Sequence, residues 1–464
     1  MTAIAKWARE LVGGAKLGDA RRDQRLLRLL TAAEKRPDGR VSATMVEKAE
    51  RQAAYDFLEH ESVEEGSVTR AICAGGMRLC AKHAEVLVAV DGSSLTLTDG
   101  AEEKDFGSVG DRRHGRRGLK VISALGMTPA GQTIALVAQE WWARQGRAPK
   151  KSKPRPLEER ESHRWHRAVE AAEQLAVEHA RKTKLHFLMD READASLLMQ
   201  RLMHGNHHFT IRANGTRNVL DLKGKRVNVR AFLAKKAPCA QYQLDVPGRG
   251  GRRPRKATME LRFASVQLVM RDRHEHKQET MTVSVVWAKE VSPSPEPLDW
   301  MLYTTKPVDN AKQARATVQR YAYRWRIEDF HRAWKGGGCN VERMQLRSKA
   351  AAIKWATVLA VVAARAQQLK QAARETPDEP ASAYFSSDEL EALIMLKRSY
   401  KAKNETIPDA PPNIEVAVRW VADLGGYIGP KNGPPGATVI GRGLQHLAPL
   451  ARVLPALRAA GKLR

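Results

Sequence analysis

Residues 86–97 read VLVAVDGSSLTL, and residues 184–190 read KLHFLMD. Both are short apolar runs of the kind that form buried strands, and we expect the strands to end at Asp91 and Asp190. Residues 119–142 add two more apolar runs around a Pro-Ala-Gly turn, and a helical pattern follows them. Strands that alternate with helices predict an α/β fold, in which ligands bind beyond the carboxyl ends of the strands.

A run of strands interrupts this α/β pattern between about residues 213 and 300. Its segments QYQLDV, ATMELRFASVQLVM and TMTVSVVWAKEV alternate apolar and polar residues, so we interpret the stretch as an all-β insertion in the core. The basic loop GRGGRRPRK separates the first two segments. Its cations are suited to holding the phosphates of a polyanion, and they are Arg252, Arg253, Arg255 and Lys256.

Both ends of the chain have helical patterns. Residues 1–75 are rich in arginine, and LGDARRDQRLLRLLTAAEK places an apolar stripe beside Arg21 and Arg22. Cations around a helical scaffold suit phosphate contacts. Residues 376–464 combine helices with Gly-Pro loops. We therefore predict three units, namely a helical unit at 1–75, the core with its insertion at 76–375, and a helical tail at 376–464.

The charge balance indicates the class of partner. With 79 Lys and Arg against 52 Asp and Glu, the formal net charge is +27, which favours a polyanion. The four cysteines lack CxxC spacing, which argues against a structural zinc site or a disulfide framework. The N-terminal residues have no signal-peptide pattern, and the apolar run from Trp355 to Ala364 is too short to cross a bilayer. We expect a cytoplasmic protein that does not contact a membrane.

A helical pattern near residue 325 reads YAYRWRIEDFHRAWKGG. On one continuous helix, Tyr321, Arg324, Glu328 and Lys335 fall within roughly 60° of arc, so a phenol, two cations and one acid share a face. Such a surface suits phosphate and metal. Arg324 offers a bidentate fork to a phosphate, and Lys335 offers a point charge.

Three acids are candidates for a metal site. Asp91 and Asp190 would end strands of the same sheet, and Glu328 would lie on a helix packed against it. Carboxylates that converge repel one another unless cations neutralise them, and oxygen ligands select Mg²⁺ or Mn²⁺. Two such ions about 4 Å apart support phosphodiester displacement. On geometry alone, the nearby acids Glu192, Asp194 and Asp329 remain alternatives.

Three segments resemble the transposases of the insertion-sequence-four family. They are AVDGSSL at 89–95, FLMDREAD at 187–194, and the spacing Tyr-x2-Arg-x3-Glu-x6-Lys at 321–335. The resemblance implies a ribonuclease-H-like catalytic core whose acids Asp91, Asp190 and Glu328 hold two Mg²⁺ ions, with Mn²⁺ as a substitute. It also implies that the N-terminal helices bind the terminal inverted repeats of a mobile element, and that the tail makes dimer contacts.

The resemblance also implies DNA contacts for side chains around the acids. Trp300, in PLDWMLYTTKP, aligns with a tryptophan that stacks on an unstacked base during a DNA hairpin step. Arg212 ends the apolar segment HHFTIR and matches a family arginine, and Trp325 lies inside the signature. Two positions depart from the family pattern. Ile122 stands where relatives commonly have histidine, and Gly441 stands where they commonly have tryptophan.

These observations predict a Mg²⁺-dependent transposase that cuts element ends through a hairpin and joins the 3′ ends to target DNA. It would act as a homodimer assembled on double-stranded DNA, and would be associated with a bacterial nucleoid when bound. Two alternatives remain open. One is a DNA-binding regulator that has lost catalysis, and the other is a structure-specific nuclease that cannot join strands.

Overall fold

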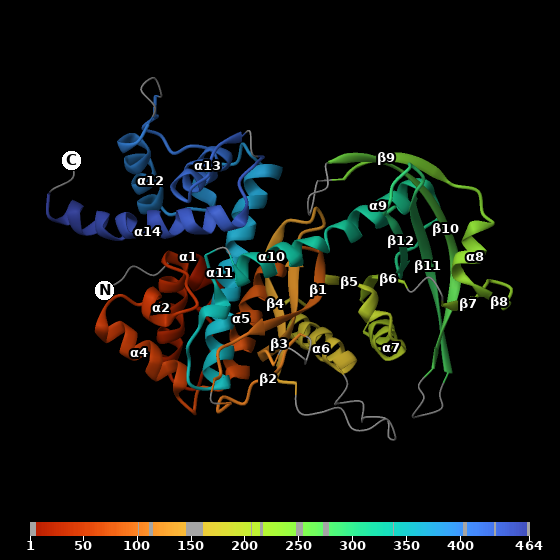
Figure 1. The fold of residues 1–464 in the computed structure, drawn as a ribbon, viewed down its shortest axis with the longest axis horizontal. Coiled ribbons are helices and arrows are strands. Elements are labelled where there is room, and N and C mark those ends of the chain that lie inside the picture. The colour runs from red at the N-terminus through yellow and green to blue at the C-terminus, as the bar shows by residue number, and fades with distance from the viewer. Residues whose placement is uncertain are drawn as a thin grey trace.

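The computed structural model shows a large mixed sheet flanked by helices (Figure 1). The arginine-rich N-terminal helices and the C-terminal helices lie together at one end of the molecule, and the strands of the insertion lie at the other. The residues described by this structure are 6–100, 102–110, 115–144, 161–205, 207–213, 217–246, 254–271, 278–336, 338–401, 406–430 and 433–461.

The central strands form the part of the sheet that carries the acids. Their order across the sheet is β2-β3-β1-β5-β6, and β4 also pairs with β3, on the edge opposite β1. Strands β1, β5 and β6 are mutually parallel, whereas β3 is antiparallel to β1. The bounds are β1 Glu85–Thr96, β2 Gly107–Ser108, β3 Arg117–Met127, β4 Thr133–Trp142, β5 Lys184–Met189 and β6 His208–Arg212.

The insertion extends this sheet. Strand β12 pairs with β6 and then with β11, so the described strands form one continuous path from β2 to β8. The prediction of an all-β insertion was wrong in one respect, because helix α8 (Val229–Ala234) lies within it. Asn228 caps that helix by accepting the Ala231 N–H, which favours a helical turn there. The strands are β7 Asn218–Leu220, β8 Arg226–Asn228, β9 Ala240–Val246, β10 Arg255–Arg271, β11 Gln278–Glu290 and β12 Asp299–Thr304.

The N-terminal helices share one hydrophobic core with the sheet. The boundary predicted at residue 75 falls inside helix α5 (Glu65–Cys80), which packs on β4. Gly76 allows this packing, since a Cβ atom there would lie 2.0 Å from the Leu136 carbonyl oxygen, and Gly75 lets α5 approach Leu11, whose carbonyl oxygen would lie 1.6 Å from a Cβ atom. The earlier helices are α1 Lys6–Val12, α2 Ala20–Lys35, α3 Val41–Thr44 and α4 Lys48–Glu59.

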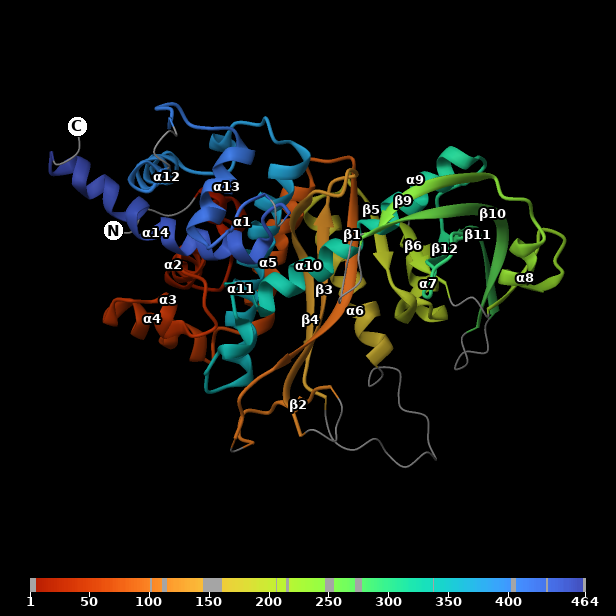
Figure 2. The ribbon, with the colours of Figure 1, turned by 45° about the horizontal axis from the view of Figure 1, so that its top comes forward.

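Helix α11 (Lys349–Glu375) runs through the helical end of the molecule (Figure 2). Among the described residues it is the one helix long and apolar enough to cross a membrane, but 89% of its apolar window is buried inside the protein. A core helix passes the same test of length and composition. The other helices of the core are α6 Glu161–His179, α7 Ser196–His204, α9 Ala311–Ala322 and α10 Trp325–Lys335.

Side chains of α11 hold the N-terminal helices in place. The buried Lys354 ammonium donates to the carbonyl oxygens of His60 (3.3 Å) and Val63 (2.7 Å), just beyond the end of α4. The Trp355 indole N–H donates to the Gly39 carbonyl. Burial lowers the pKa of Lys354, and Glu65 and Glu59 oppose that shift. The orientation of the N-terminal helices therefore depends on buried polar contacts with α11.

We expect Lys354→Met to destabilise the protein by about 1–3 kcal/mol, because it leaves two buried carbonyl groups without their donor. Chemical denaturation of the full chain measures this change. Lys48→Met, at the exposed first position of α4, is the matched control and should change stability by less than about 0.5 kcal/mol. Equal effects of the two substitutions would show that the Lys354 contacts contribute nothing.

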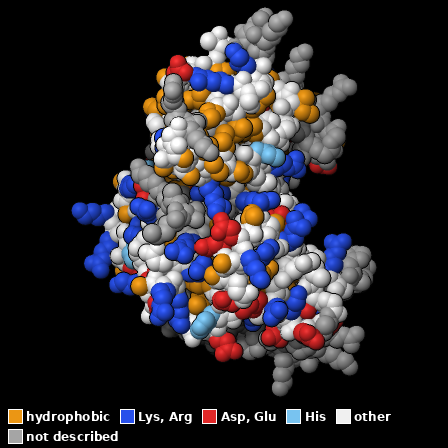
Figure 3. All heavy atoms as spheres, turned by 90° about the vertical axis from the view of Figure 1, so that its left-hand side faces the viewer, with side chains coloured by type: hydrophobic (Ala, Val, Ile, Leu, Met, Phe, Trp, Pro, Cys, Tyr) orange, Lys and Arg blue, Asp and Glu red, His pale blue; other side chains and the backbone are white. Residues whose placement is uncertain are grey.

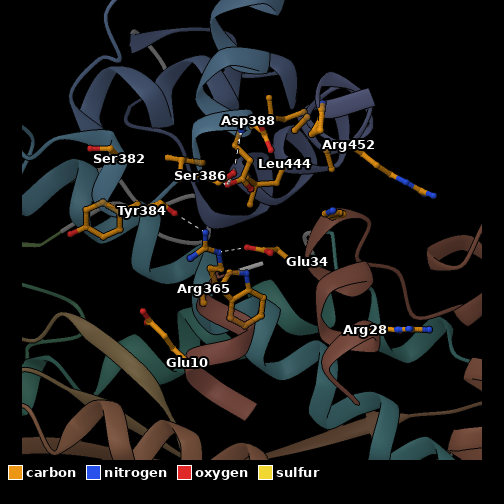
Figure 4. Close-up of a pocket in the computed structure, with 18 of the residues that line it drawn as sticks. Glu10, Arg28, Glu34, Arg365, Ser382, Tyr384, Ser386, Asp388, Leu444 and Arg452 are labelled. Carbon is orange, nitrogen blue, oxygen red and sulfur yellow. Dashed lines mark hydrogen bonds and ion pairs between the residues drawn. The ribbon is translucent and has the colours of Figure 1, made fainter. Parts of the chain in front are cut away.

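The C-terminal helices have a hydrophobic cluster of their own, to which Leu369 and Ala372 of α11 contribute. A cavity of about 1090 Å³ is lined by residues of α1, α2, α4, α12 and α14 (Figure 4). Arg365 of α11 crosses one side of it, paired with Glu34 and donating to the Tyr384 carbonyl at 2.7 Å. The C-terminal helices are α12 Ser387–Ser399, α13 Ile414–Leu424 and α14 Ala437–Ala459.

Candidate active site

Asp91 and Asp190 lie at the same level on neighbouring parallel strands. The last paired residues of β1 and β5 are Ala89 and Leu188, and each aspartate comes two residues later. In-register residues of a parallel pair point to the same face, so both carboxylates project from one face of the sheet. The expectation that Asp91 ends its strand was wrong, because β1 continues to Thr96 by pairing with β3. Only the pairing of β1 with β5 ends near Asp91.

Local hydrogen bonds orient the two aspartates. Asp190 caps the short 3₁₀ helix η3 (Arg191–Ala193), and its Oδ1 accepts the Glu192 N–H at 2.8 Å. Oδ1 of Asp91 accepts the Gly92 N–H at 2.9 Å. Neither of these two hydrogen bonds uses the Oδ2 atom of its aspartate.

The signature segment is two helices rather than one. Helix α9 ends at Ala322, α10 begins at Trp325, and the residues between them have right-handed helical dihedral angles. The prediction of one continuous helix was therefore wrong. Backbone bonds of the i→i−3 type, such as Arg324 N–H to Tyr321 C=O at 2.9 Å, tighten the chain there, as in a 3₁₀ turn.

A turn in the core sheet accommodates this break. Gly131, in the turn between β3 and β4, has a φ of +85°, and a Cβ atom there would lie 2.4 Å from the Tyr323 ring. The ring of Tyr323 thus rests on the turn, and α10 continues across β1 (Figures 1 and 2). The break separates Tyr321, on α9, from Glu328, on α10.

Arg324 joins two of the predicted acids. Its Nη2 donates to Oε1 of Glu328 at 2.8 Å, and its Nη1 lies 3.4 Å from Oδ2 of Asp91. Burial raises the pKa of Asp91 to about 6; Arg324 opposes this shift, and Asp190 and Glu328 add to it. Asp190 and Glu328 are therefore close enough to act electrostatically on Asp91.

The donor set fits a divalent cation. Asp91, Asp190 and Glu328 offer hard carboxylate oxygens, the ligands that Mg²⁺ and Mn²⁺ prefer. Within the described ranges, no three Asp, Glu, His or Cys side chains are already drawn together as a metal cage. Arg324 instead lies between two of the acids.

The alternative acids are engaged elsewhere. Asp329 pairs with Lys370 of α11 at 2.7 Å, pointing away from Glu328, its neighbour in sequence. Asp194 pairs with Arg217 at 2.5 Å. The side chain of Glu192 is exposed, and its backbone N–H donates to the capping carboxylate of Asp190. Two of the three alternative acids thus have cationic partners of their own, while the choice of Asp91, Asp190 and Glu328 stays a prediction.

Three side chains predicted to contact DNA form one group beside the acids. Tyr321 is buried and meets the half-buried Trp300 ring edge-on, at 6.1 Å between centroids. Burial raises the pKa of Tyr321 to about 12, with smaller opposing effects from Arg324 and Arg212. Arg212 donates to the Asp299 carbonyl at 3.1 Å, and its buried Nε has no hydrogen-bond partner among the described residues.

Helix α10 carries further predicted contacts. The Trp325 side chain is 40% exposed and lies beside the Arg324 guanidinium, and Lys335 is the last residue of the helix. Sequence reasoning missed His331, one turn after Glu328. Burial lowers the pKa of His331 to about 3, helped by Lys335 and Arg324, so the ring is neutral. The i,i+3 spacing from Glu328 was the available signal.

Other predicted cations have varied surroundings. Arg255 pairs with Glu290 on the adjacent strand β11, while Lys256 is exposed. The Arg21 side chain is 94% exposed, whereas Arg22 donates to backbone carbonyls at Leu17 and Ser62. Arg252 and Arg253 lie outside the described residues.

The two departures from the family pattern are buried. Ile122 sits on β3 opposite Gly92, next to the Asp91–Ser123 pair. Gly441 of α14 packs near Gly338, where a Cβ atom on Gly338 would lie 3.5 Å from the Gly441 carbonyl carbon.

Two family models match this chain. Residues 4–63 match the model described as Transposase DNA-binding, and residues 134–364 match the model described as Transposase DDE domain. Asp190 and Glu328 lie inside the second match, and Asp91 precedes it. A DDE domain implies a ribonuclease-H-like core and the use of divalent metal ions. The chain belongs to the DDE transposases, DNA-binding enzymes that cut and join DNA, with the domain architecture of the insertion-sequence-four type.

Proposed function

We propose that this transposase binds the terminal inverted repeats of its element, cuts them by Mg²⁺-dependent phosphodiester hydrolysis, and joins the 3′ ends to target DNA. The observation that carries the proposal is the arrangement of the acids. Asp91 and Asp190 project from one level of the sheet, and Arg324 ties Glu328 of α10 to Asp91.

Asp91, Asp190 and Glu328 would hold two Mg²⁺ ions, for which Mn²⁺ substitutes. Such a site would supply Lewis-acid activation of a water or a 3′ hydroxyl and charge stabilisation of the leaving oxygen in an in-line displacement. The protein contributes orientation. The hydrogen bonds from Gly92 and Glu192 hold the two aspartates in place, and the neutral His331 packs beside the Phe330 and Trp334 rings of α10.

The group formed by Trp300, Tyr321 and Arg212 supports a hairpin intermediate. A hairpin requires a base to leave the stack, and a half-buried indole provides a surface for that base. Arg212 and Arg324 each have a buried Nε–H without a partner among the described residues. These donors would pair with the phosphates on either side of the displaced base.

The N-terminal helices would hold the element end. The lower half of the face in Figure 3, where these helices lie, carries many Lys and Arg side chains, with acids among them. The exposed Arg21 and the half-exposed Arg28 are suited to phosphate contacts there. Of the predicted loop cations, Lys256 would contact more distant phosphates.

We also propose that the enzyme acts as a homodimer assembled on DNA, in the cytoplasm at the nucleoid. Two ends must be cut together for clean excision. We expect the complex with duplexes of one terminal repeat to contain two chains and two duplexes, as measured by mass photometry at low salt. A complex of one chain with one duplex at every protein concentration would contradict this expectation.

An assay on flanking repeats tests the proposed function. An end-labelled duplex carrying the terminal repeat should be nicked, converted to a hairpin and cut only when Mg²⁺ or Mn²⁺ is present. A pre-cut 3′ end should then be joined to a second DNA. Cutting without joining would indicate a structure-specific nuclease, and binding without cutting would indicate a regulator.

A further inference from the structure

The guanidinium of Arg324 occupies the position between two proposed metal ligands. It is 2.8 Å from Glu328 Oε1 and 3.4 Å from Asp91 Oδ2, and the residue is only 7% exposed. These oxygens belong to separate elements, β1 and α10, so the guanidinium links the sheet to the helix at this point. The contact is central to the site rather than a surface ion pair.

The surroundings of Arg324 are suited to a charge that changes partners. Its guanidinium carbon lies 5.3 Å from the Trp325 ring centroid and 6.0 Å from that of Tyr321, so aromatic faces support the cation. Its Nε–H has no partner within the described part of the chain. The longer contact, to Asp91, is the weaker of the two carboxylate contacts, and the shorter one is an i,i+4 pair on the same helix segment.

We infer that Arg324 is an internal counter-ion that competes with the divalent cation. Its single charge partly neutralises Asp91 and Glu328 in the free protein, and the guanidinium moves away from Asp91 when that carboxylate ligates a metal. This inference rests on the proposed assignment of Asp91 and Glu328 as metal ligands. The physical reason is that a divalent cation bound by Asp91 and Glu328 would lie close to the Arg324 guanidinium, and the two cations repel.

Competition with the metal and a role in orienting the metal ligands predict opposite effects of Arg324 on metal binding. If Arg324 only positioned the acids, removing it would weaken metal binding. As a competitor, its removal strengthens metal binding. We expect Arg324→Gln to tighten Mn²⁺ binding to the free protein about 10- to 100-fold, corresponding to the loss of one or two charge-assisted hydrogen bonds.

The test is calorimetric titration of metal-free full-length protein with Mn²⁺, without DNA. Arg332→Gln is the matched control, because Arg332 is exposed on the same helix and pairs with Asp329, so the change removes the same charge without touching the acids. Its Mn²⁺ affinity should stay within about threefold of the wild type. Arg324→Lys keeps the charge but loses the fork, and should give an intermediate affinity.

Thermal melting provides a second readout that does not depend on activity. In EDTA, Arg324→Gln should melt below Arg332→Gln, because Asp91 and Glu328 lose their counter-ion. Saturating Mn²⁺ should raise the melting temperature of Arg324→Gln more than that of the wild type. If Arg324→Gln does not fold, Arg324→Lys supplies both measurements.

The outcomes separate the inference from the proposed function. Unchanged or weaker Mn²⁺ binding by both Arg324 variants would overturn the competition alone. Asp91→Asn and Glu328→Gln, measured in parallel, should each weaken Mn²⁺ binding at least about tenfold. If neither does so, the metal site itself is wrongly assigned, whatever Arg324 does.

Discussion

Glu328→Gln should abolish the first nick, hairpin formation and strand joining together, each by about a thousandfold or more. All three steps use the same metal-bound carboxylates, and residues that act as a unit lose the whole effect when one is removed. The amide keeps the shape of the side chain and its acceptor for Arg324 but removes the charge that holds a divalent cation. A time course on an end-labelled duplex, resolved on a denaturing gel, measures every step.

Asp329→Asn is the matched control for this loss. Asp329 is the next residue on α10, but its carboxylate pairs with Lys370 and Arg332. The variant should bind the terminal repeat and retain nicking within about tenfold, because it removes a structural pair rather than a ligand. A variant Asp329→Asn that is inactive while Glu328→Gln still cuts would show that the ligand was assigned to the wrong neighbour.

Trp300→Ala should leave the first nick largely intact while slowing hairpin formation about 10- to 100-fold. The indole of Trp300 offers no metal ligand, and its ring meets the ring of Tyr321 edge-on rather than contacting the acids. Stacking of one base on an aromatic ring is worth about 1–3 kcal/mol, which corresponds to one to two decades in rate. The nicked product should therefore accumulate in the time course.

Because Trp300 is half-buried and packs against the cluster of β10, β11 and α9, its structural role needs a control. Trp300→Phe keeps an aromatic face and should restore most of the hairpin rate. Trp325→Ala removes an exposed indole on α10 and should affect nicking and hairpin formation alike. Equal loss of nicking and hairpin formation in Trp300→Ala, with a lowered melting temperature, would make Trp300 a core residue.

Much of the site could be predicted because its chemistry is local in sequence. Asp190 and Glu328 lie in segments whose spacing resembles the family, and both fall inside the matched DDE domain. The alternatives Asp194 and Asp329 could not be excluded from the sequence, since they are also carboxylates and lie four residues after Asp190 and next to Glu328, respectively. Only their partners, Arg217 and Lys370, distinguish them, and these come from distant parts of the chain.

The errors have a common physical origin. Helical periodicity places Tyr321 and Glu328 on one face, but the segment breaks at Tyr323, whose ring rests on the turn at Gly131. The apparent end of β1 at Asp91 reflected the loss of apolar residues, while its pairing with β3 sustained the strand. Both errors come from contacts made by other segments, which local propensity does not contain.

The sequence by itself determined the class of the protein. The class follows from the resemblance of three segments, 89–95, 187–194 and 321–335, to a transposase family, and such motifs are local in sequence, so they need no knowledge of packing. Only the tertiary structure decided which charges meet. Arg324 could have faced a phosphate, solvent or a carboxylate, and it lies between Asp91 and Glu328 because α10 packs on β1 where pairing with β5 has stopped. Arg255, counted in the sequence as a cation available to DNA, is likewise paired with Glu290 of the neighbouring strand. The reason is that the strength of an ion pair depends on distance and burial, and both are set by the fold.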